Sequence, residues 1–308
     1  PMYLDRYEGY LFQYFPSTGQ MSRQKPCHNN SIKSLALDGN GYLLAGTDNG
    51  LYVYHNDVTP LQHIIHDSRN IQSLTNNIIW NIFADQEHNI WLGTDYGISL
   101  SRYNSALQFI PISQITGTGD GNQFYSLFRD SKGFYWFGGT NGLIRFTDPA
   151  GDKHNAIWYR MGDKTYPLSH NRIRHIYEDK EQQLWIATDG SINRYDYATR
   201  QFVHYNIVDS TGTYNTNWTY YMFEDNAGHL WISTCLGGIF VVDKHRLMQS
   251  ASGQYVAEQN YSVHNGLSGM FINQIIPDNE GNVWVLLYNN KGIDKINPRT
   301  REVTKIIC

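Results

Sequence analysis

Several features that would point to particular classes of protein are scarce or missing in this sequence. No run of eighteen or more apolar residues occurs, so no segment has the length of a membrane-spanning helix. Charged residues make up only 17% of the 308 residues, the net charge is −4, and no Lys/Arg run stands out. Because binding to a phosphate backbone needs a basic stripe, we expect no nucleic-acid partner.

Reactive and cofactor-binding motifs are missing as well. The three cysteines, Cys27, Cys235 and Cys308, are far apart and lack CxxC spacing, which argues against a zinc site and a disulfide-dense scaffold and leaves the compartment open. Gly-x-Ser-x-Gly and P-loop patterns do not occur, and we expect no metal and no cofactor. No secretory leader is visible, but a start at Pro1 is compatible with the removal of a leader, an anchor or whole domains.

Aromatic residues and glycines are plentiful. The chain has 8 Trp, 23 Tyr, 13 Phe and 27 Gly, a composition that favours strands and turns over long helices. An Asp followed six residues later by Trp or Leu recurs six times, with successive Asp residues 45 to 53 positions apart. A constant core with variable connections at this period is typical of β-propeller blades. The six pairs are Asp38/Leu44, Asp85/Trp91, Asp130/Trp136, Asp179/Trp185, Asp225/Trp231 and Asp278/Trp284.

Each repeat predicts four strands. Apolar residues three and six positions before the Asp, such as Ile173 and Ile176, indicate a short buried inner strand, although their spacing alone also suits a helix. Asp-x-x-Gly then predicts a type I turn, which should tolerate His88 and Gln182 in place of the Gly. The Trp lies on the second strand, and the polar fourth strand, such as 201–205, should be an edge strand on the outer rim.

We therefore predict an all-β fold, a single β-propeller domain over residues 1–308. It should contain six four-stranded repeats preceded by the tail of a seventh, a partial first blade that lacks its inner strands. The expected limits are 1–20 for the partial blade and about 30–68, 77–115, 122–166, 171–209, 217–264 and 270–308 for the repeats.

The repeated Asp and Trp residues could be acids, calcium ligands or stacking platforms for a ligand. Catalytic acids at one phase of every repeat make no chemical sense, whereas equivalent turns do, so we interpret each Asp as a turn residue. We interpret each Trp as a large ring buried at the seam between neighbouring blades.

The composite motif resembles the two-component regulator propeller repeat. It consists of two apolar residues three positions apart, then Asp-x-x-Gly, then Trp-apolar-Gly-Thr, and finally a hairpin turn that contains Gly. Segments 76–85 and 168–179 match especially well, and residues 3–12 resemble the close of the family's first blade. The sequence departs from the pattern at Leu44, which replaces Trp, at 286–287, where Leu-Leu replaces Gly-Thr, and in the partial first blade.

The resemblance implies seven blades per propeller and a periplasmic sensor region of a hybrid two-component system of gut Bacteroidetes. It also implies a second propeller and an immunoglobulin-like dimerisation module as partners within the same receptor. A membrane helix and a histidine kinase would complete the full-length protein, so the membrane is reached only through parts outside these 308 residues. The implied function is signalling in response to oligosaccharides released from glycans.

The ligand site is expected on one face of the propeller. Strand direction alternates in a blade, so the fourth-to-first connection and the second-to-third hairpin should share the face opposite the Asp turns. Five residues before each Asp the copies diverge, as a binding site on a symmetric scaffold should. Aromatic and polar groups there suit a sugar, and we predict that they ring the mouth of the central funnel. These candidates are Lys33, Trp80, Tyr125, Arg174, Tyr220 and Asn273.

Other residues on the same expected face are weaker candidates, namely Asp95, Tyr96, His170 and Trp218. An Asn stands eight residues before the Asp in five repeats, at Asn30, Asn77, Asn122, Asn171 and Asn217. We interpret these Asn side chains as bonding locally to the backbone where the inner strand begins.

Two alternative functions remain open. Streptogramin lyases are also propellers with Gly-x-x-Trp repeats, but they need a His-based acid/base pair. None of the 12 His lies in a recognisable catalytic motif, and His175 on an inner strand is interpreted as a core residue. Sialidases need an Arg triad and a Tyr nucleophile, of which the sequence shows no sign. We predict a binding and signalling module without catalytic residues, with a lyase-like enzyme as second possibility and a protein-interaction scaffold as third.

Overall fold

The computed structural model describes twelve segments of the chain. They are residues 2–7, 10–15, 18–24, 27, 30–55, 60–103, 109–111, 122–147, 156–165, 167–250, 254–288 and 292–307. The chain forms two compact units, residues 1–157 and 158–308. The expected repeat limits at 115, 166 and 308 lie outside the described residues. None of the helices in these segments could span a lipid bilayer.

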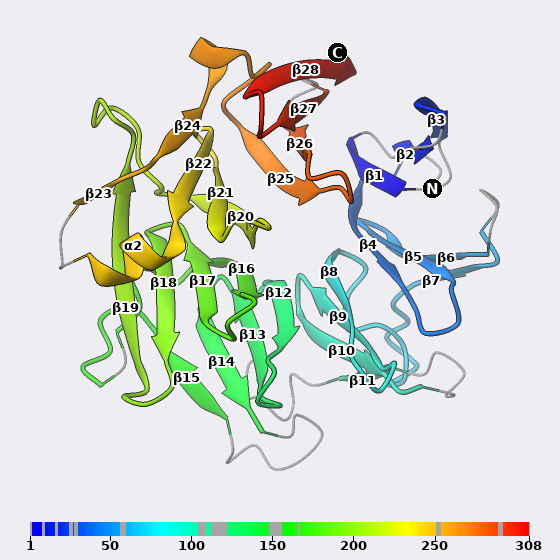
Figure 1. Ribbon diagram of the computed structural model, residues 1–308. Coiled ribbons are helices and arrows are strands. Elements are labelled where there is room, and N and C mark those ends of the chain that lie inside the picture. The colour runs from blue at the N-terminus through cyan, green and yellow to red at the C-terminus, as the bar shows by residue number, and fades with distance from the viewer. Residues whose placement is uncertain are drawn as a thin grey trace. The chain divides into compact units, whose positions relative to one another are not determined.

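The first unit is built from antiparallel sheets that follow one another along the chain (Figure 1). The partial blade forms a three-stranded sheet that continues past residue 20, with strands β1 (Met2–Tyr7), β2 (Tyr10–Phe15) and β3 (Gln20–Gln24). Two four-stranded sheets follow: β4 (Ile32–Leu37), β5 (Leu43–Thr47), β6 (Gly50–Tyr54) and β7 (Gln62–Ile64), then β8 (Ile79–Ala84), β9 (Ile90–Thr94), β10 (Gly97–Ser101) and β11 (Phe109–Pro111). The last sheet contains β12 (Phe124–Arg129), β13 (Tyr135–Gly139) and β14 (Gly142–Phe146), and the unit boundary falls within β15 (Ile157–Tyr159).

The second unit repeats the same plan. Its first sheet contains β16 (Ile173–Glu178), β17 (Leu184–Thr188), β18 (Ser191–Asp196) and β19 (Gln201–Val208). The next contains β20 (Thr219–Glu224), β21 (His229–Thr234), β22 (Ile239–Asp243) and β24 (Gln259–Tyr261), and the last contains β25 (Ile272–Pro277), β26 (Val283–Leu287), β27 (Ile293–Asn297) and β28 (Glu302–Ile307). The all-β prediction is confirmed.

An insertion in the fifth repeat changes the edge of the preceding sheet. Helix α2 (Lys244–Gln249) and strand β23 (Gln254–Val256) lie between β22 and β24, which accounts for the longest Asp-to-Asp spacing. Strand β23 pairs in parallel with residues 206–208 of β19. Residues 201–205, predicted as an edge strand, pair with β18, and β23 covers only the extension of β19 at 206–208.

Every inner strand carries a β-bulge, which explains its helix-like apolar spacing. The pairing of β16 with β17 shifts between Ile173 and His175, so one extra residue separates the ladder positions. Ile173 and Ile176, three residues apart, are 0% and 2% exposed, and the equivalent residues of β25, Ile272 and Ile275, belong to one hydrophobic core. An ordinary strand would put them on opposite faces, because its side chains alternate.

Five repeats close the Asp turn with a bond to the Trp of the second strand. Oδ1 of Asp85 accepts the N–H groups of Glu87 and Asn89 at 3.0 and 2.8 Å, and Oδ2 accepts Nε1–H of Trp91 at 2.8 Å. The interpretation of the Asp as a turn residue is confirmed. The hydrogen bond between its carboxylate and the Trp indole was not expected from the sequence. The same bond, 2.7 to 3.0 Å long, joins Asp130 to Trp136, Asp179 to Trp185, Asp225 to Trp231 and Asp278 to Trp284.

The fourth residue of these turns lies in the left-handed region. The φ angles of Gly41, Gly133, Gly228 and Gly281 are 84° to 86°, and those of His88 and Gln182 are 62° and 61°. A residue with a Cβ pays roughly 1–2 kcal/mol for this conformation. His88 and Gln182 therefore carry a conformational cost that the type I turn interpretation did not include.

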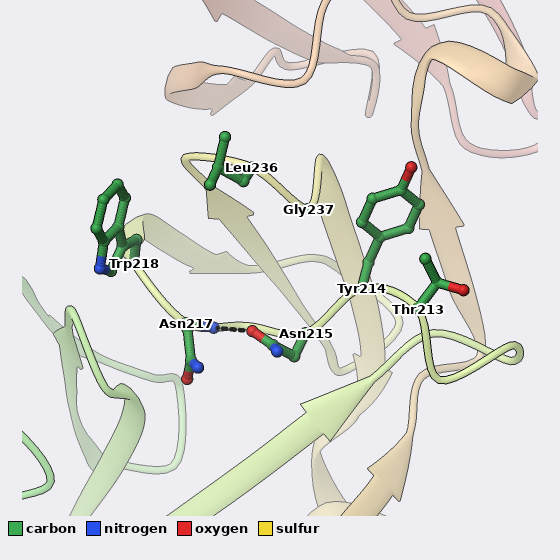
Figure 2. Close-up of a pocket in the computed structure, with 7 residues that line it drawn as sticks. All are labelled: Thr213, Tyr214, Asn215, Asn217, Trp218, Leu236 and Gly237. Atoms are coloured by element: carbon green, nitrogen blue, oxygen red, sulfur yellow. Dashed lines mark hydrogen bonds between the residues drawn. The ribbon is translucent and has the colours of Figure 1, made fainter.

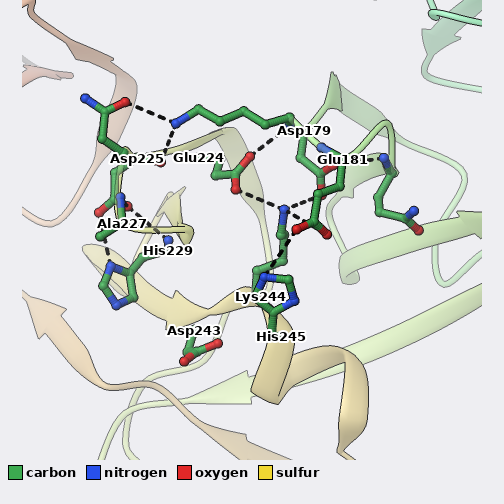
Figure 3. Close-up of polar contacts among 12 residues, drawn as sticks. Asp179, Glu181, Glu224, Asp225, Ala227, His229, Asp243, Lys244 and His245 are labelled. Atoms are coloured by element: carbon green, nitrogen blue, oxygen red, sulfur yellow. Dashed lines mark hydrogen bonds and ion pairs between the residues drawn. The ribbon is translucent and has the colours of Figure 1, made fainter.

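A buried lysine joins two sheets of the second unit. Lys244, the first residue of α2, has a fully buried side chain, and its Nζ lies 3.2 Å from Oδ2 of Asp179 and 2.9 Å from Oε1 of Glu224 (Figure 3). Asp179 follows β16 and Glu224 ends β20, so one cation binds the turns of neighbouring sheets. A third carboxylate, that of the half-exposed Glu181, lies 3.6 Å away.

Candidate functional site

The hairpin and the connection before the inner strand lie together in every repeat. In each one, an N–H of the second-to-third hairpin donates to the carbonyl of the residue directly before the inner strand, as Asp189 does to Arg172 at 3.2 Å. The prediction that these loops share a face is confirmed repeat by repeat. The other pairs are Asp48 to Ser31, Asp95 to Ile78, Thr140 to Gln123, Cys235 to Trp218 and Tyr288 to Phe271.

The six predicted ligand-binding residues occupy the β-bulges. The register shift in each inner strand skips one residue, so the regular Cα pairing with the second strand passes over it. Bulges bend a strand and redirect a side chain, and they are common beside functional sites. The skipped residues are Lys33, Trp80, Tyr125, Arg174, Tyr220 and Asn273. The positions where the repeats diverge in sequence are therefore the positions that the backbone leaves outside the regular pairing.

Three of these side chains form a continuous series in the first unit. The ammonium of Lys33 lies 4.5 Å from the centre of the Trp80 ring, and that ring meets Tyr125 edge-on at 5.3 Å. Each of the three is half-buried. The cation and the two aromatic rings thus present one mixed surface.

Asp95 holds this series in place. One oxygen of Asp95, in the hairpin after β9, accepts Nε1–H of Trp80 at 2.9 Å and the Gln123 amide at 2.5 Å. Gln123 in turn accepts the hydroxyl of Tyr125. Asp95 was a weaker candidate, and Gln123 was missed. Neighbouring Tyr96 is 50% exposed.

Arg174 and Tyr220 come together in the second unit. The guanidinium of Arg174 binds both oxygens of Asp189, at 2.7 and 3.2 Å, and lies 4.6 Å from the centre of the Tyr220 ring. Arg172 adds a longer contact to the same carboxylate, at 3.6 Å. The Asp189 side chain is only 7% exposed, so its charge depends on Arg174 for compensation.

Tyr220 and the neighbouring Cys235 thiol are neutral at physiological pH. Burial raises the pKa of Tyr220 to about 12, although the charge of Arg174 acts in the opposite direction. Burial also raises the pKa of the Cys235 thiol. Tyr288 meets Tyr220 at 5.8 Å, and Asn273, on the contacting strand β25, is only 6% exposed. The arrangement suits binding rather than proton transfer.

Trp218 is the most unusual residue of this face. It precedes β20 in the left-handed region, with φ of 54°, and its side chain is 48% exposed. With the 53% exposed Leu236 it lines a pocket of about 220 Å³, floored by Asn215 and Asn217 (Figure 2). A large aromatic residue in this backbone region is strained, and such strain tends to collect at functional sites. From the sequence, Trp218 is only a weaker candidate.

The remaining expectations for this face have structural explanations. Oδ1 of Asn77 accepts the N–H of His66 at 2.6 Å and that of Asn171 accepts the N–H of Met161 at 2.7 Å. These side chains do bind the backbone, but ten or eleven residues away rather than locally, and so they anchor the incoming connection. His170 accepts the N–H of Arg172. His175 accepts the N–H of Met222 at 3.3 Å, as expected for a core residue.

Across the part of the chain that the structure describes, no group of three His, Cys, Asp or Glu side chains is arranged to hold a metal ion.

Comparison with known families agrees with this geometry. The family described as two component regulator propeller matches residues 73–96, 118–141 and 167–190, each of which spans an inner strand, an Asp turn and a second strand. Three of the six complete repeats of the chain are thus matched by this family's model.

Solved structures that are similar to this chain include extracellular domains of two-component systems. The extracellular domain of a hybrid two-component system of B. thetaiotaomicron, BT4673, is 93% identical over 97% of this chain, with a TM-score of 0.63. That of BT3049 from the same organism is 20% identical over 99% of the chain, with a TM-score of 0.73, and shows the fold alone. The β-propeller prediction is confirmed.

The chain spans only 40% of each of those two extracellular domains. Histidine kinase P4 of Formosa agariphila is 26% identical over 205 residues, which are 61% of this chain and 13% of the kinase. The chain is therefore similar to the propeller portion of the sensor region of a two-component system.

Proposed function

We propose that this chain is a periplasmic ligand-sensing propeller of a hybrid two-component regulator and that its ligands are glycan-derived oligosaccharides. Its relatives include extracellular domains of hybrid two-component systems and a histidine kinase, which supports a sensor role outside the cytoplasm. The full-length protein would then carry the kinase, the membrane helix, the second propeller and the dimerisation module.

The observation that carries the ligand class is the chemistry of the bulge residues. Trp80, Tyr125 and Tyr220 offer ring faces, and Lys33 and Arg174 offer donors beside them. Sugars present apolar ring faces together with many hydroxyls, so they match a surface where aromatic groups alternate with fixed polar groups. The strained, exposed Trp218 adds a further ring on the same loops of the second unit.

Titration calorimetry against a panel of glycan oligosaccharides tests this proposal. One glycan class should give saturable heat, and at least one of Trp80→Ala, in the first unit, and Trp218→Ala, in the second, should weaken its binding roughly tenfold or more, which is the loss of about 1.4 kcal/mol. Arg174→Ala is a less clean probe, because it also leaves the buried Asp189 with only the longer contact from Arg172. Val256→Ala, at an exposed position on β23, is the matched control and should bind normally.

Two outcomes would overturn the proposal. No heat across the whole panel would argue against glycan sensing by this chain. Binding that is unchanged in both Trp variants would place the ligand elsewhere. Conversion of any panel member to a product would favour the lyase-like alternative.

A further inference from the structure

A second pocket lies on the Asp-turn side of the first unit. It has a volume of about 400 Å³ and lies at the seam between the sheets β4–β7 and β8–β11. Leu44 of β5 and Ile90 of β9, both at least 95% buried, contribute to its floor, while Tyr42, His88 and Tyr103 contribute ring faces and Asp38 a carboxylate. This volume lies within the range of small-molecule sites.

The pocket lies in the repeat in which Leu replaces Trp. At the next seam, Trp91 fills the same position and packs against Tyr135 and Phe137 at 5.2 and 5.6 Å. Leu44 is smaller than Trp91, and Ile90, which corresponds to Tyr135 in the following repeat, is smaller as well. The seam is lined by aliphatic groups on both sides, including Val53.

The carboxylate of Asp38 is also left without the bond that its counterparts make. Its Oδ1 accepts the N–H groups of Asn40 and Tyr42 at 2.9 and 2.8 Å, as in the other turns. Among the described residues, nothing donates to its Oδ2, the atom that accepts an indole N–H in five other repeats. The site therefore combines an apolar floor, aromatic walls and one available carboxylate oxygen.

From this geometry we propose that the pocket binds a planar heteroaromatic molecule that carries an N–H donor, with indole as the simplest member. The ring would lie over Leu44 and Ile90, between Tyr42 and the His88–Tyr103 pair, whose rings are 5.3 Å apart. Its N–H would donate to Oδ2 of Asp38. An apolar cavity of about 150 Å³ suffices to bind benzene, so the space available here is ample for a two-ring molecule.

A sugar fits this pocket less well, because the aliphatic floor offers no partners for its hydroxyls. The inference does not depend on the proposed function, since the pocket lies on the Asp-turn side and shares none of the bulge residues. Failure of glycan binding would leave it intact, and failure of indole binding would leave the sensor proposal intact.

Calorimetry with indole and 1-methylindole tests the pairing with Asp38. The wild-type chain should bind indole, and 1-methylindole, which lacks the N–H, should bind roughly tenfold more weakly, because a bond to a charged acceptor is lost. In Asp38→Asn that preference should disappear, while the amide oxygen can still accept the two turn N–H groups. Equal affinity of the wild type for both compounds, or tighter binding of glucose than of indole, would overturn the proposal.

Filling the pocket provides an independent test. Leu44→Trp should abolish indole binding and should melt no lower than the wild type, since the new indole can bind Asp38 as in the other repeats. Val203→Trp, at an exposed position on β19 of the second unit, is the control and should bind indole normally. Indole binding that persists in Leu44→Trp would place the site elsewhere. If Leu44→Trp does not fold, the Asp38→Asn comparison still decides.

Discussion

Replacing Lys244 by Met should destabilise the second unit more than any other single lysine substitution in the described part of the chain. Met has a similar length and apolar stem, so the change removes the charge while largely keeping the volume. The carboxylates of Asp179 and Glu224, with side chains 0% and 5% exposed, would then lie buried without a cation. Breaking a buried ion pair in this way costs about 3–5 kcal/mol.

This loss is a large part of the stability of a typical domain, which is about 5–15 kcal/mol. The melting temperature should fall by roughly 10 °C, and the urea midpoint should fall with it. Burial alone would lower the pKa of Lys244, but its hydrogen bond to Glu224 and the charge of Asp179 outweigh burial and raise the pKa. A raised folded-state pKa means that the contribution is complete below the ordinary lysine value and is lost as the pH rises beyond it. The two proteins should therefore converge in stability only above about pH 10.5.

Two further variants test the physical reason. Lys180→Met removes an exposed ammonium that binds Asn226 and the carbonyl of Asp225, and it should cost less than about 1 kcal/mol. Adding Glu224→Gln to Lys244→Met removes one of the uncompensated charges and should recover part of the loss. A cost below 1 kcal/mol for Lys244→Met, or no recovery in the double variant, would refute the reasoning.

Three other predictions concern strain and protonation. Trp218→Gly should be about 1 kcal/mol more stable than Trp218→Ala in urea unfolding, the reverse of the usual order, because only Gly adopts the left-handed conformation freely; equal stabilities would argue against strain there. Gln182→Gly should be neutral or stabilising by up to about 1 kcal/mol, since the strain relieved exceeds the entropy of glycine, and a clear loss would contradict this. Burial lowers the pKa of His175 to about 3, so its contribution is complete above pH 6.5 and declines as the pH falls towards 3. At pH 5 the wild-type chain should therefore have lost roughly 2 kcal/mol of its free energy of unfolding. His175→Gln should not show this loss when urea unfolding of both proteins is measured at pH 7 and pH 5. An equal loss in both proteins would exclude His175 as its cause.

The sequence predicts the repeated features of this fold well and the individual ones poorly. The Asp turns, the buried Trp and the strand order follow from residues that recur at one spacing, so each copy supports the others. The bulges were not predicted, because an extra residue in a strand leaves only an apolar spacing of three, which also suits a helix. Lys244 lies in an insertion that occurs once, and no repeat could indicate that its side chain is buried between two carboxylates.

The candidate site shows the same division. Divergence among the repeats selected the six bulge residues, but their acidic partners were largely overlooked. Asp95 lies fifteen positions after its bulge residue, Trp80, and Asp189 lies fifteen positions after Arg174. That shared offset is visible in the sequence and could have indicated the pairs. The strain at Trp218 could not have been found in this way, since it depends on backbone geometry that only the structure provides.

The bulges have a consequence for how such receptors can diversify. A residue that takes no part in strand pairing can be exchanged without shifting the register of its sheet. Six such positions, one in each complete repeat, can vary while the sheets that carry them keep their structure. Gene duplication could therefore yield paralogues with new ligand preferences through a few substitutions at these bulge positions. The same property makes them the natural positions for a combinatorial library that retargets the scaffold.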